Sequence, residues 1–248
     1  WWADAAAGCV MWLDVDIQRR MRAAGQVFDL QVALCCTAPQ VVLCGPSGAG
    51  KSLTLRAVAG LLRPDHGHVR LHGEDVFRRT GQARVDVPAR RRRIGYVFQD
   101  YALFPFLSVR QNVAFGLQGG WLNPSPDRRD ERVERWLHAL RIDDVADSLP
   151  GEISGGQRQR TALARALAPG PQALLLDEPF AALDHALRDH LRSELQHVLA
   201  QAGIPLLLIS HDPQDVAMFG GQVFRIDGGR VVGPDEAGSS SPLTPPCP

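Results

Sequence analysis

The sequence predicts an α/β fold with a mostly parallel sheet at its centre. Short apolar runs, typical of strands buried on both faces, occupy residues 41–44, 173–176 and 206–209. Residues 185–201, between the second and third runs, carry apolar side chains on one helical face. A strand, a helix and a strand in this order indicate parallel strands, because parallel neighbours need a long crossover connection.

The other elements are expected from their own patterns. Strands are predicted over 11–17, 26–34, 40–44, 68–71, 94–98, 173–177 and 205–210. Helices are predicted over 51–62, 132–140, 157–167 and 185–201. Helical patterns dominate the middle of the chain, so a helical subdomain inserted over about 100–168 is expected within a main domain of residues 1–232. Residues 233–248, rich in Pro, Ser and Gly, are expected to be a flexible tail.

Composition narrows the functional classes. The 248 residues include 27 basic and 27 acidic side chains, whereas a dedicated nucleic-acid binder usually has a basic excess. The apolar runs fall short of the roughly 18 to 20 residues that cross a bilayer, and no export signal opens the chain, so a soluble protein is expected. The cysteines show no C-x-x-C spacing, which favours small buried residues in a reducing cytoplasm: Cys9, Cys35, Cys36, Cys44 and Cys247.

A run of arginines at 90–93, with Arg78, Arg79 and Arg84 nearby, is the most basic part of the chain. It could mark a surface for RNA or anionic lipid. Since the overall charge is zero, a solvated loop is the preferred interpretation.

One glycine-rich segment has the form G-x-x-x-x-G-K-[ST] and lies between a predicted strand and a predicted helix. Glycines let the backbone curl so that N–H groups face phosphate oxygens, and the helix adds its positive end. Lys51 is expected to reach the β- and γ-phosphates, and Ser52 to ligate Mg²⁺. The strand before the motif and the helix after it are the elements that a P-loop requires, which disfavours a chance match. A nucleotide-binding P-loop NTPase is therefore predicted. The segment is Gly45, Pro46, Ser47, Gly48, Ala49, Gly50, Lys51 and Ser52.

Two acidic residues, Asp177 and Glu178, end the apolar strand predicted over 173–177. In a parallel sheet, ligands bind beyond the carboxyl ends of the strands, so Asp177 is expected beside the P-loop as a Mg²⁺ ligand. Glu178 points elsewhere and could polarise the water that attacks the γ-phosphate. Acids at strand ends are often simply solvated, and the upstream P-loop is what favours the catalytic interpretation.

Residues 153–158, Ile-Ser-Gly-Gly-Gln-Arg, resemble the L-S-G-G-Q signature of ABC ATPases, with Ile replacing the first Leu. In isolation this could be an ordinary helix cap, but it is also a second helix start able to bind an anion. The resemblance implies a head-to-tail dimer in which this segment caps ATP held by the partner chain. Its contacting residues would be Ser154, Gly155, Gly156 and Gln157.

Three further segments resemble the same family. Gln99 matches the Q-loop glutamine, which the resemblance assigns to Mg²⁺ or to the attacking water. Residues 182–184 (Ala-Leu-Asp) resemble the D-loop along the dimer seam. His211, which follows a predicted strand and precedes Asp-Pro, resembles the switch histidine near the γ-phosphate, although a lone histidine is more often structural.

The resemblance extends from about residue 13 to 232 and is greatest to importer ATPases. It implies ATP and Mg²⁺ as cofactors, ATP hydrolysis, and a peripheral location on the cytoplasmic face of the cell membrane. The implied partners are a second ATPase chain, transmembrane permease subunits and a solute-binding protein, without nucleic acid. Residues 101–109 could fit a groove for a helix of the permease, or could equally be local core.

Residues 93–100 and the N-terminal segment look most like molybdate importer ATPases, so an oxyanion such as molybdate is the expected solute. Sulfate, iron and polyamine importers are similar alternatives. A non-transport ABC ATPase acting on ribosomes or DNA usually carries two ATPase domains or a long coiled coil, and neither is evident. A regulatory module without hydrolysis is a further alternative, against which Glu178 and His211 argue.

Two departures from the family pattern stand out. The aromatic residue that stacks on adenine is missing from the window 21–26; Arg22 could stack instead, and Phe28 is expected to face the core. Many molybdate-type relatives also continue into a regulatory β-domain, and none is expected here.

Overall fold

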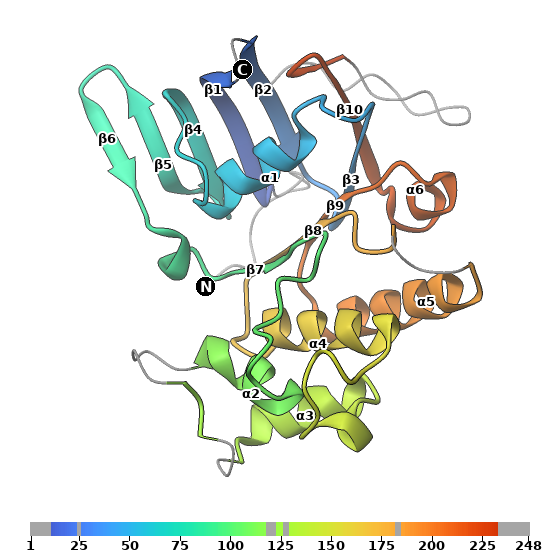
Figure 1. Ribbon diagram of the computed structural model, residues 1–248. Coiled ribbons are helices and arrows are strands. Elements are labelled where there is room, and N and C mark those ends of the chain that lie inside the picture. Colours follow the sequence, from blue (N-terminus) through green and yellow to red (C-terminus); the bar gives the residue numbers. More distant parts are fainter. Residues whose placement is uncertain (1–10, 24–25, 118–122, 126–128, 182–184, 233–248) are drawn as a thin grey trace, which may run out of the picture.

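The computed structural model describes residues 11–23, 26–117, 123–125, 129–181 and 185–232. Within these residues one sheet of 11 strands has the order β6-β5-β4-β1-β2-β11-β10-β3-β9-β8-β7. Figure 1 shows this sheet in the upper half, with a group of helices below it.

Five strands at one end of this order pair in parallel, as the crossover pattern predicts. Their carboxyl ends therefore meet at one edge of the sheet, where β3 runs into the P-loop and β8 ends at Asp177. The five are β10 (Gln222–Asp227), β3 (Gln40–Cys44), β9 (Leu206–Ile209), β8 (Ala173–Asp177) and β7 (Ile94–Val97).

The other end of the sheet is antiparallel. It contains β1 (Leu13–Ala23), β2 (Gln26–Cys36), β4 (His66–Leu71), β5 (Glu74–Thr80) and β6 (Ala83–Asp86). The short β11 (Arg230–Val231) joins the two parts, since it is antiparallel to β10 and parallel to β2. The predicted fold class, a mostly parallel core with an antiparallel β subdomain and an inserted group of helices, is confirmed.

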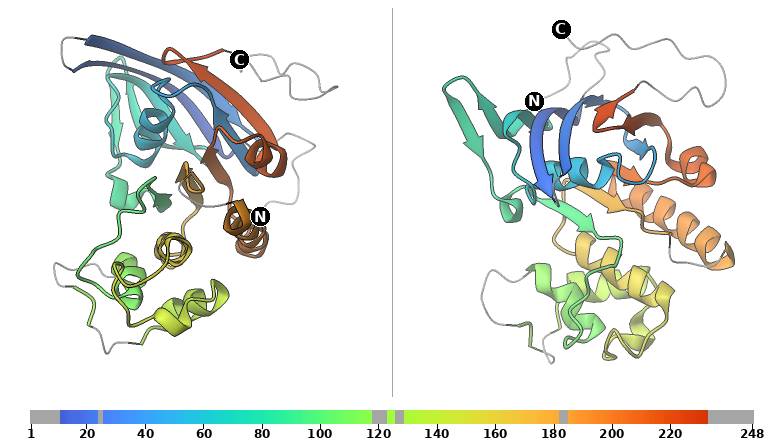
Figure 2. Two further views of the ribbon diagram at one scale, coloured as in Figure 1. Left: turned by 45° about the vertical axis from the view of Figure 1, so that its right-hand side comes forward. Right: turned by 45° about the horizontal axis from the view of Figure 1, so that its top comes forward.

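Helices cover both faces of the parallel strands. Figure 2 shows the antiparallel strands curving over α1, with α2, α3 and α4 grouped together on the far side of the parallel strands. Among the described residues no helix is both long enough and apolar enough to span a membrane. The helices are α1 (Lys51–Ala59), α2 (Val109–Ala114), α3 (Glu131–Ala139), α4 (Gly155–Leu167), α5 (His185–Ala202) and α6 (Pro213–Phe219), with short 3₁₀ turns at Ala89–Arg91, Phe115–Leu117 and Asp143–Val145.

Successive side chains of a parallel strand point to opposite faces of the sheet, so the buried side chains form two separate hydrophobic cores. Val41 and Leu43 of β3 pack in the core that contains α1, whereas Val42 packs in the core that contains α4 and α5. The buried face of α1 and the buried face of α4 therefore lie on opposite faces of the same strands. This separation decides which sequence motifs can meet within one chain.

The predicted helix over 51–62 is too long by three residues. Gly60 has a left-handed φ of +79° and ends the helix, with its N–H donating to the carbonyl of Ala57. The start of α4, in contrast, lies two residues before the predicted Gln157, because Ser154 caps it. Elements β5, β6, β10, β11 and α6 were not expected, since they are short or rich in charged residues.

The interpretation of the arginine run as a solvated loop is wrong for Arg92, whose side chain is buried. Its guanidinium donates to the carbonyl oxygens of Ala57 and Val58, in the last turn of α1, and to that of Val87. The last carbonyls of a helix lack intrahelical donors. Arg92 supplies a donor for Val58 and a second one for Ala57, which also accepts the N–H of Gly60. Arg91, one position earlier, is exposed as expected.

Candidate nucleotide-binding site

The P-loop connects β3 to α1 through three glycines with positive φ. The φ angles are +138° at Gly45, +78° at Gly48 and +105° at Gly50. A Cβ on Gly45 would lie 2.0 Å from the carbonyl oxygen of Ile226 in β10, so no other residue fits at this position. This backbone forms a concave loop at the N-terminus of α1, where N–H groups and the helix dipole favour an anion.

Lys51 is the first residue of α1 and is buried. Its Nζ donates hydrogen bonds of 2.8 Å to the carbonyl oxygens of Gly45 and Pro46. The ammonium group is thus held by the loop that it follows. An ammonium group has three N–H donors and these bonds use two of them, so Lys51 can donate the third to a phosphate oxygen.

Ser52 and Asp177 come together at the carboxyl end of β8. Ser52 Oγ donates to Asp177 Oδ1 at 2.9 Å, and the phenol of Tyr96 on β7 donates to Asp177 Oδ2 at 3.3 Å. Burial raises the pKa of Asp177 despite these two hydrogen bonds, which lower it. Burial also raises the pKa of Tyr96, next to Asp177, so the phenol stays protonated and remains a donor.

This pair fits a magnesium ion. Mg²⁺ prefers hard oxygen ligands and is commonly held by one or two protein side chains together with phosphate oxygens. Ser52 and Asp177 offer a hydroxyl and a carboxylate directly beside the P-loop. The third predicted ligand, Gln99, lies exposed in the turn after β7, whose last residue pairs with Leu176 of β8.

Glu178 has a strained backbone, with a φ of +48° that is uncommon for a residue other than glycine. Its N–H donates to the carbonyl of Ile209 at 3.1 Å, which ties the residue to the end of β9. His211 follows β9, and its Nδ1 lies 3.6 Å from Glu178 Oε1. The structure thus brings together the two residues that were expected to act on water.

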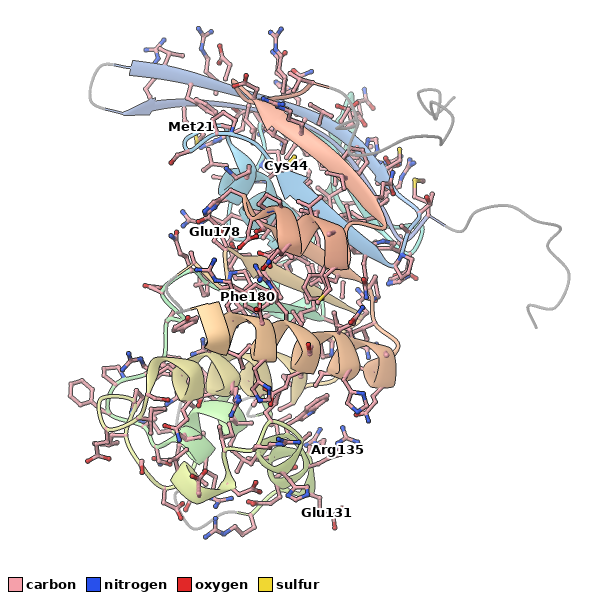
Figure 3. The ribbon with its side chains drawn as sticks, turned by 90° about the vertical axis from the view of Figure 1, so that its right-hand side faces the viewer. Met21, Cys44, Glu131, Arg135, Glu178 and Phe180 are labelled. Atoms are coloured by element: carbon pink, nitrogen blue, oxygen red, sulfur yellow. The ribbon has the colours of Figure 1, made fainter. Side chains whose placement is uncertain are left out.

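A small cavity of about 40 Å³ lies beside Glu178 and His211. Its size suits one or two water molecules rather than an organic ligand. Figure 3 shows Phe180, which contributes to its wall, beside α5, with Glu178 nearer to α6. The lining residues are Glu178, Phe180, Ala181, Arg188, Ser210, His211, Asp212 and Asp215.

Ser154 caps α4 through a capping box. Its Oγ accepts the N–H of Gln157 at 3.3 Å, and Gln157 Oε1 accepts the N–H of Ser154 at 2.9 Å. Ser154 is exposed, Gly155 is half-buried and Gly156 is buried. Since α4 and α1 cover opposite faces of the parallel strands, one chain keeps this segment apart from its own P-loop.

The remaining predictions have mixed outcomes. Phe28 is half-buried against the core beside α1, as expected, whereas Arg22 is exposed. In residues 101–109 Tyr101, Leu107 and Val109 are core residues, whereas Phe106 is 89% exposed, so the groove for a permease helix stays a prediction. The D-loop residues 182–184 lie outside the described residues.

The sequence interpretation missed several side chains that support this site. Tyr96 had no assigned role, and Arg192, Ser210 and Asp215 were not considered. Tyr96 stands three residues before Gln99 on a predicted strand, but the pairing of that strand with β8 was not predicted. Arg192, on a helix, offered no comparable signal.

Comparison with known proteins agrees with this geometry. The family described as ABC transporter matches residues 32–181 of the chain. The chain belongs to the ABC transporter family. Its matched region includes the P-loop, Gln99, the Ser154 segment and the Asp177–Glu178 pair.

Several curated ABC relatives are importer subunits. A molybdate/tungstate import ATP-binding protein of Archaeoglobus fulgidus is 44% identical over 191 residues, which are 77% of this chain and 75% of the relative. A sulfate/thiosulfate import ATP-binding protein of Synechocystis sp. is 42% identical over 207 residues, 83% of this chain and 56% of the relative. A spermidine/putrescine import ATP-binding protein of Pseudomonas aeruginosa is 42% identical over 198 residues, which are 78% of this chain and 51% of the relative. The chain thus spans about half the length of the sulfate and polyamine relatives.

Solved ABC cassettes share the fold. One, a dimeric ATP-binding cassette in a post-hydrolysis state with ADP and Pi, aligns with a TM-score of 0.74 and 28% identity. The alignment covers 90% of this chain and 97% of the cassette.

Proposed function

We propose that this chain is the ATP-binding and hydrolysing subunit of an ABC importer. The observation that carries the proposal is the Ser52–Asp177 hydrogen bond beneath a P-loop, together with a helix start at Ser154 on the opposite face of the strands. The P-loop with Ser52 and Asp177 forms half of a nucleotide site. The helix start at Ser154 can bind an anion but does not face the P-loop of its own chain. Two chains in head-to-tail contact complete both sites.

The P-loop residues, from Gly45 to Ser52, bind the triphosphate of ATP. Their N–H groups and Lys51 Nζ contact the β- and γ-phosphate oxygens, Lys51 with the N–H that Gly45 and Pro46 do not accept. Ser52 and Asp177 hold Mg²⁺, with Gln99 as the third side chain at this edge of the sheet. When bound, Mg²⁺ neutralises charge that develops on the phosphate oxygens.

Hydrolysis is assigned to Glu178 and His211. Glu178 accepts a hydrogen bond from water and orients it toward the γ-phosphate, and His211, 3.6 Å away, contacts the phosphate and holds Glu178. Ser154, Gly155, Gly156 and Gln157 of the partner chain close over the γ-phosphate. The residues 182–184 are assigned to the seam between the two chains.

The partner in the membrane is a permease, contacted at the cytoplasmic face. The exposed Phe106, together with Phe104 and Phe115, whose rings lie 4.2 Å apart, supplies an apolar surface for a short helix. An oxyanion such as molybdate is the proposed solute, delivered by a solute-binding protein. The relatives that transport sulfate, polyamines and iron define the alternative solutes.

A complementation experiment tests the two-chain site. Chains with Lys51→Ala and chains with Ser154→Arg are each expected to be inactive, whereas their mixture regains ATP hydrolysis. In the mixed dimer one site combines an intact P-loop with an intact Ser154 segment. A mixture of Lys51→Ala and Asp177→Asn is the control, because both changes affect the same half-site and no intact site can form.

Activity in the control mixture, or none in the first mixture, would contradict the proposal. The solute is tested separately, by uptake of radiolabelled molybdate and sulfate in cells that carry the wild-type chain or its Glu178→Gln variant. Molybdate uptake that is equal in both would exclude this solute.

A further inference from the structure

Arg192, on α5, is one of the most deeply buried charged side chains in the described residues, with a relative exposure of 1%. Its Nε donates to Asp215 Oδ1 at 2.5 Å, and one terminal nitrogen donates to Asp212 Oδ2 at 2.6 Å. The other donates to Asp189 Oδ1 at 2.8 Å and also to Gln214 Oε1. Three of these four partners belong to the segment that begins with His211.

The residues next to His211 are fixed by the same network. Ser210 Oγ donates to the carboxylate of Asp215 and accepts the N–H of Asp212 at 3.1 Å. Asp212 Oδ1 accepts the N–H of Gln214 at 2.9 Å, which caps α6. The backbone is thus fastened on both sides of His211, while its imidazole remains 66% exposed and free to meet a ligand.

Arg192 also reaches the segment that follows Glu178. The guanidinium carbon lies 5.8 Å from the centre of the Phe180 ring, which is buried and stacks on Phe219 of α6. Phe180 comes two residues after Glu178. One side chain therefore touches the segments that carry both members of the Glu178–His211 pair, although it contacts neither member itself.

Stability alone is a weak reason for such a network. Burying the guanidinium of Arg192 with the carboxylate of Asp215 carries a large desolvation cost. Replacing a buried ion pair by well-packed apolar side chains often leaves a protein equally stable or more stable. What the network supplies is orientation, because the planar guanidinium fixes the directions of its five donors. We propose that Arg192 is a positioning residue that holds His211 opposite Glu178 for hydrolysis, an inference that rests on the function proposed above.

The test is Arg192→Lys, which keeps the charge but loses the fork of donors. We expect kcat for ATP hydrolysis by the full chain to fall about tenfold or more, because a misplacement of about 1 Å at a catalytic group has effects of this size. KM and the affinity for ATP should change far less than kcat, because the phosphate contacts proposed for the P-loop and Lys51 do not involve this network. Asp215→Asn, which approaches the same network from α6, should reproduce this pattern.

Arg110→Lys is the matched control. Arg110 is also a buried arginine whose guanidinium bonds two carboxylates, those of Asp147 and Glu134, but it lies on α2, in the helical subdomain. Its replacement should lower thermal stability without lowering kcat. Amide hydrogen exchange supplies a readout independent of turnover: Arg192→Lys should speed exchange at Asp212 and Gln214, and Arg110→Lys should not.

A double-mutant cycle with His211→Ala shows whether Arg192 acts through His211. If it does, Arg192→Lys lowers kcat in the wild-type background and has no further effect once His211 is removed. The inference would be overturned if Arg192→Lys lowered kcat by the same factor in the wild-type and His211→Ala backgrounds. It would also be overturned if the wild type were active and Arg192→Lys left kcat unchanged. Absence of hydrolysis by the wild-type chain would instead refute the proposed function.

Discussion

Ser52 Oγ donates a hydrogen bond of 2.9 Å to Asp177 Oδ1, joining residues that are 125 positions apart in the sequence. This bond brings the first turn of α1 to the carboxyl end of β8. It leaves Asp177 only 3% exposed, and burial is the main cause of its raised pKa. A carboxylate placed to bind a cation is therefore unfavourable in the protein without that cation.

The first prediction is a pH-dependent stability difference between wild type and Asp177→Asn. The folded pKa of Asp177 lies above that of the unfolded chain, so protonation favours folding. Relative to the variant, wild type should be most stable below about pH 4, near the ordinary pKa of Asp. This advantage should be lost as the pH rises through the folded pKa, measured by urea unfolding without nucleotide.

Asp65→Asn is the control with the opposite sign. The N–H of Arg20 is the main cause of the lowered pKa of Asp65, and Arg19 adds to it. The Asp65 carboxylate should stabilise the folded protein above the pKa that Asp65 has in the unfolded chain. This contribution should disappear as the pH falls through the pKa of Asp65 in the folded protein. The same slope in both variants would show that Asp177 is not destabilised by burial.

The second prediction concerns Glu178→Gln. The amide keeps the shape of the side chain but is a poor base, so ATP binding should persist while turnover falls by about 100-fold or more. Light scattering should then detect an ATP-dependent dimer. Glu131→Gln, an exposed change in α3, should leave turnover unchanged. Full turnover by Glu178→Gln would remove Glu178 from the mechanism.

The third prediction contrasts two glycines of the P-loop. Gly45→Ala should lower the free energy of unfolding by more than about 3 kcal/mol, because the new Cβ would collide with the Ile226 backbone. Gly48→Ala should cost only about 1 kcal/mol, since its Cβ meets no atom within 4 Å and only its left-handed φ is strained. Urea unfolding measures both, and equal losses would contradict the close approach.

The fourth prediction concerns the end of α1. Arg92→Met should destabilise the protein by about 2–3 kcal/mol, because the carbonyls of Val58 and Val87 lose the guanidinium donor and Ala57 keeps only the N–H of Gly60. Burial lowers the pKa of Arg92, and nearby Asp86 only partly offsets this. Arg91→Met, on the exposed neighbour, should change stability by less than about 0.5 kcal/mol. A small effect at both positions would mean that water can replace the guanidinium.

The sequence by itself determined the elements whose signals are local. The bounds predicted for β3 and β8 are those of the structure, since each is a continuous apolar run bounded by a turn or by acids. The P-loop was evident for the same reason: its glycines, Lys51 and Ser52 are adjacent, and their conformation follows from residue type. The parallel orientation of β8 and β9 was also predictable, because a helix separates them in the sequence.

Only the tertiary structure decided what depends on residues far apart in the chain. Arg92 looks like any arginine in a polar run until the end of α1 is placed beside it. Arg192 and Tyr96 likewise acquire roles only when α6 and β8 are packed against them. The partners of a long polar side chain depend on packing across the sheet, and no local pattern encodes that packing.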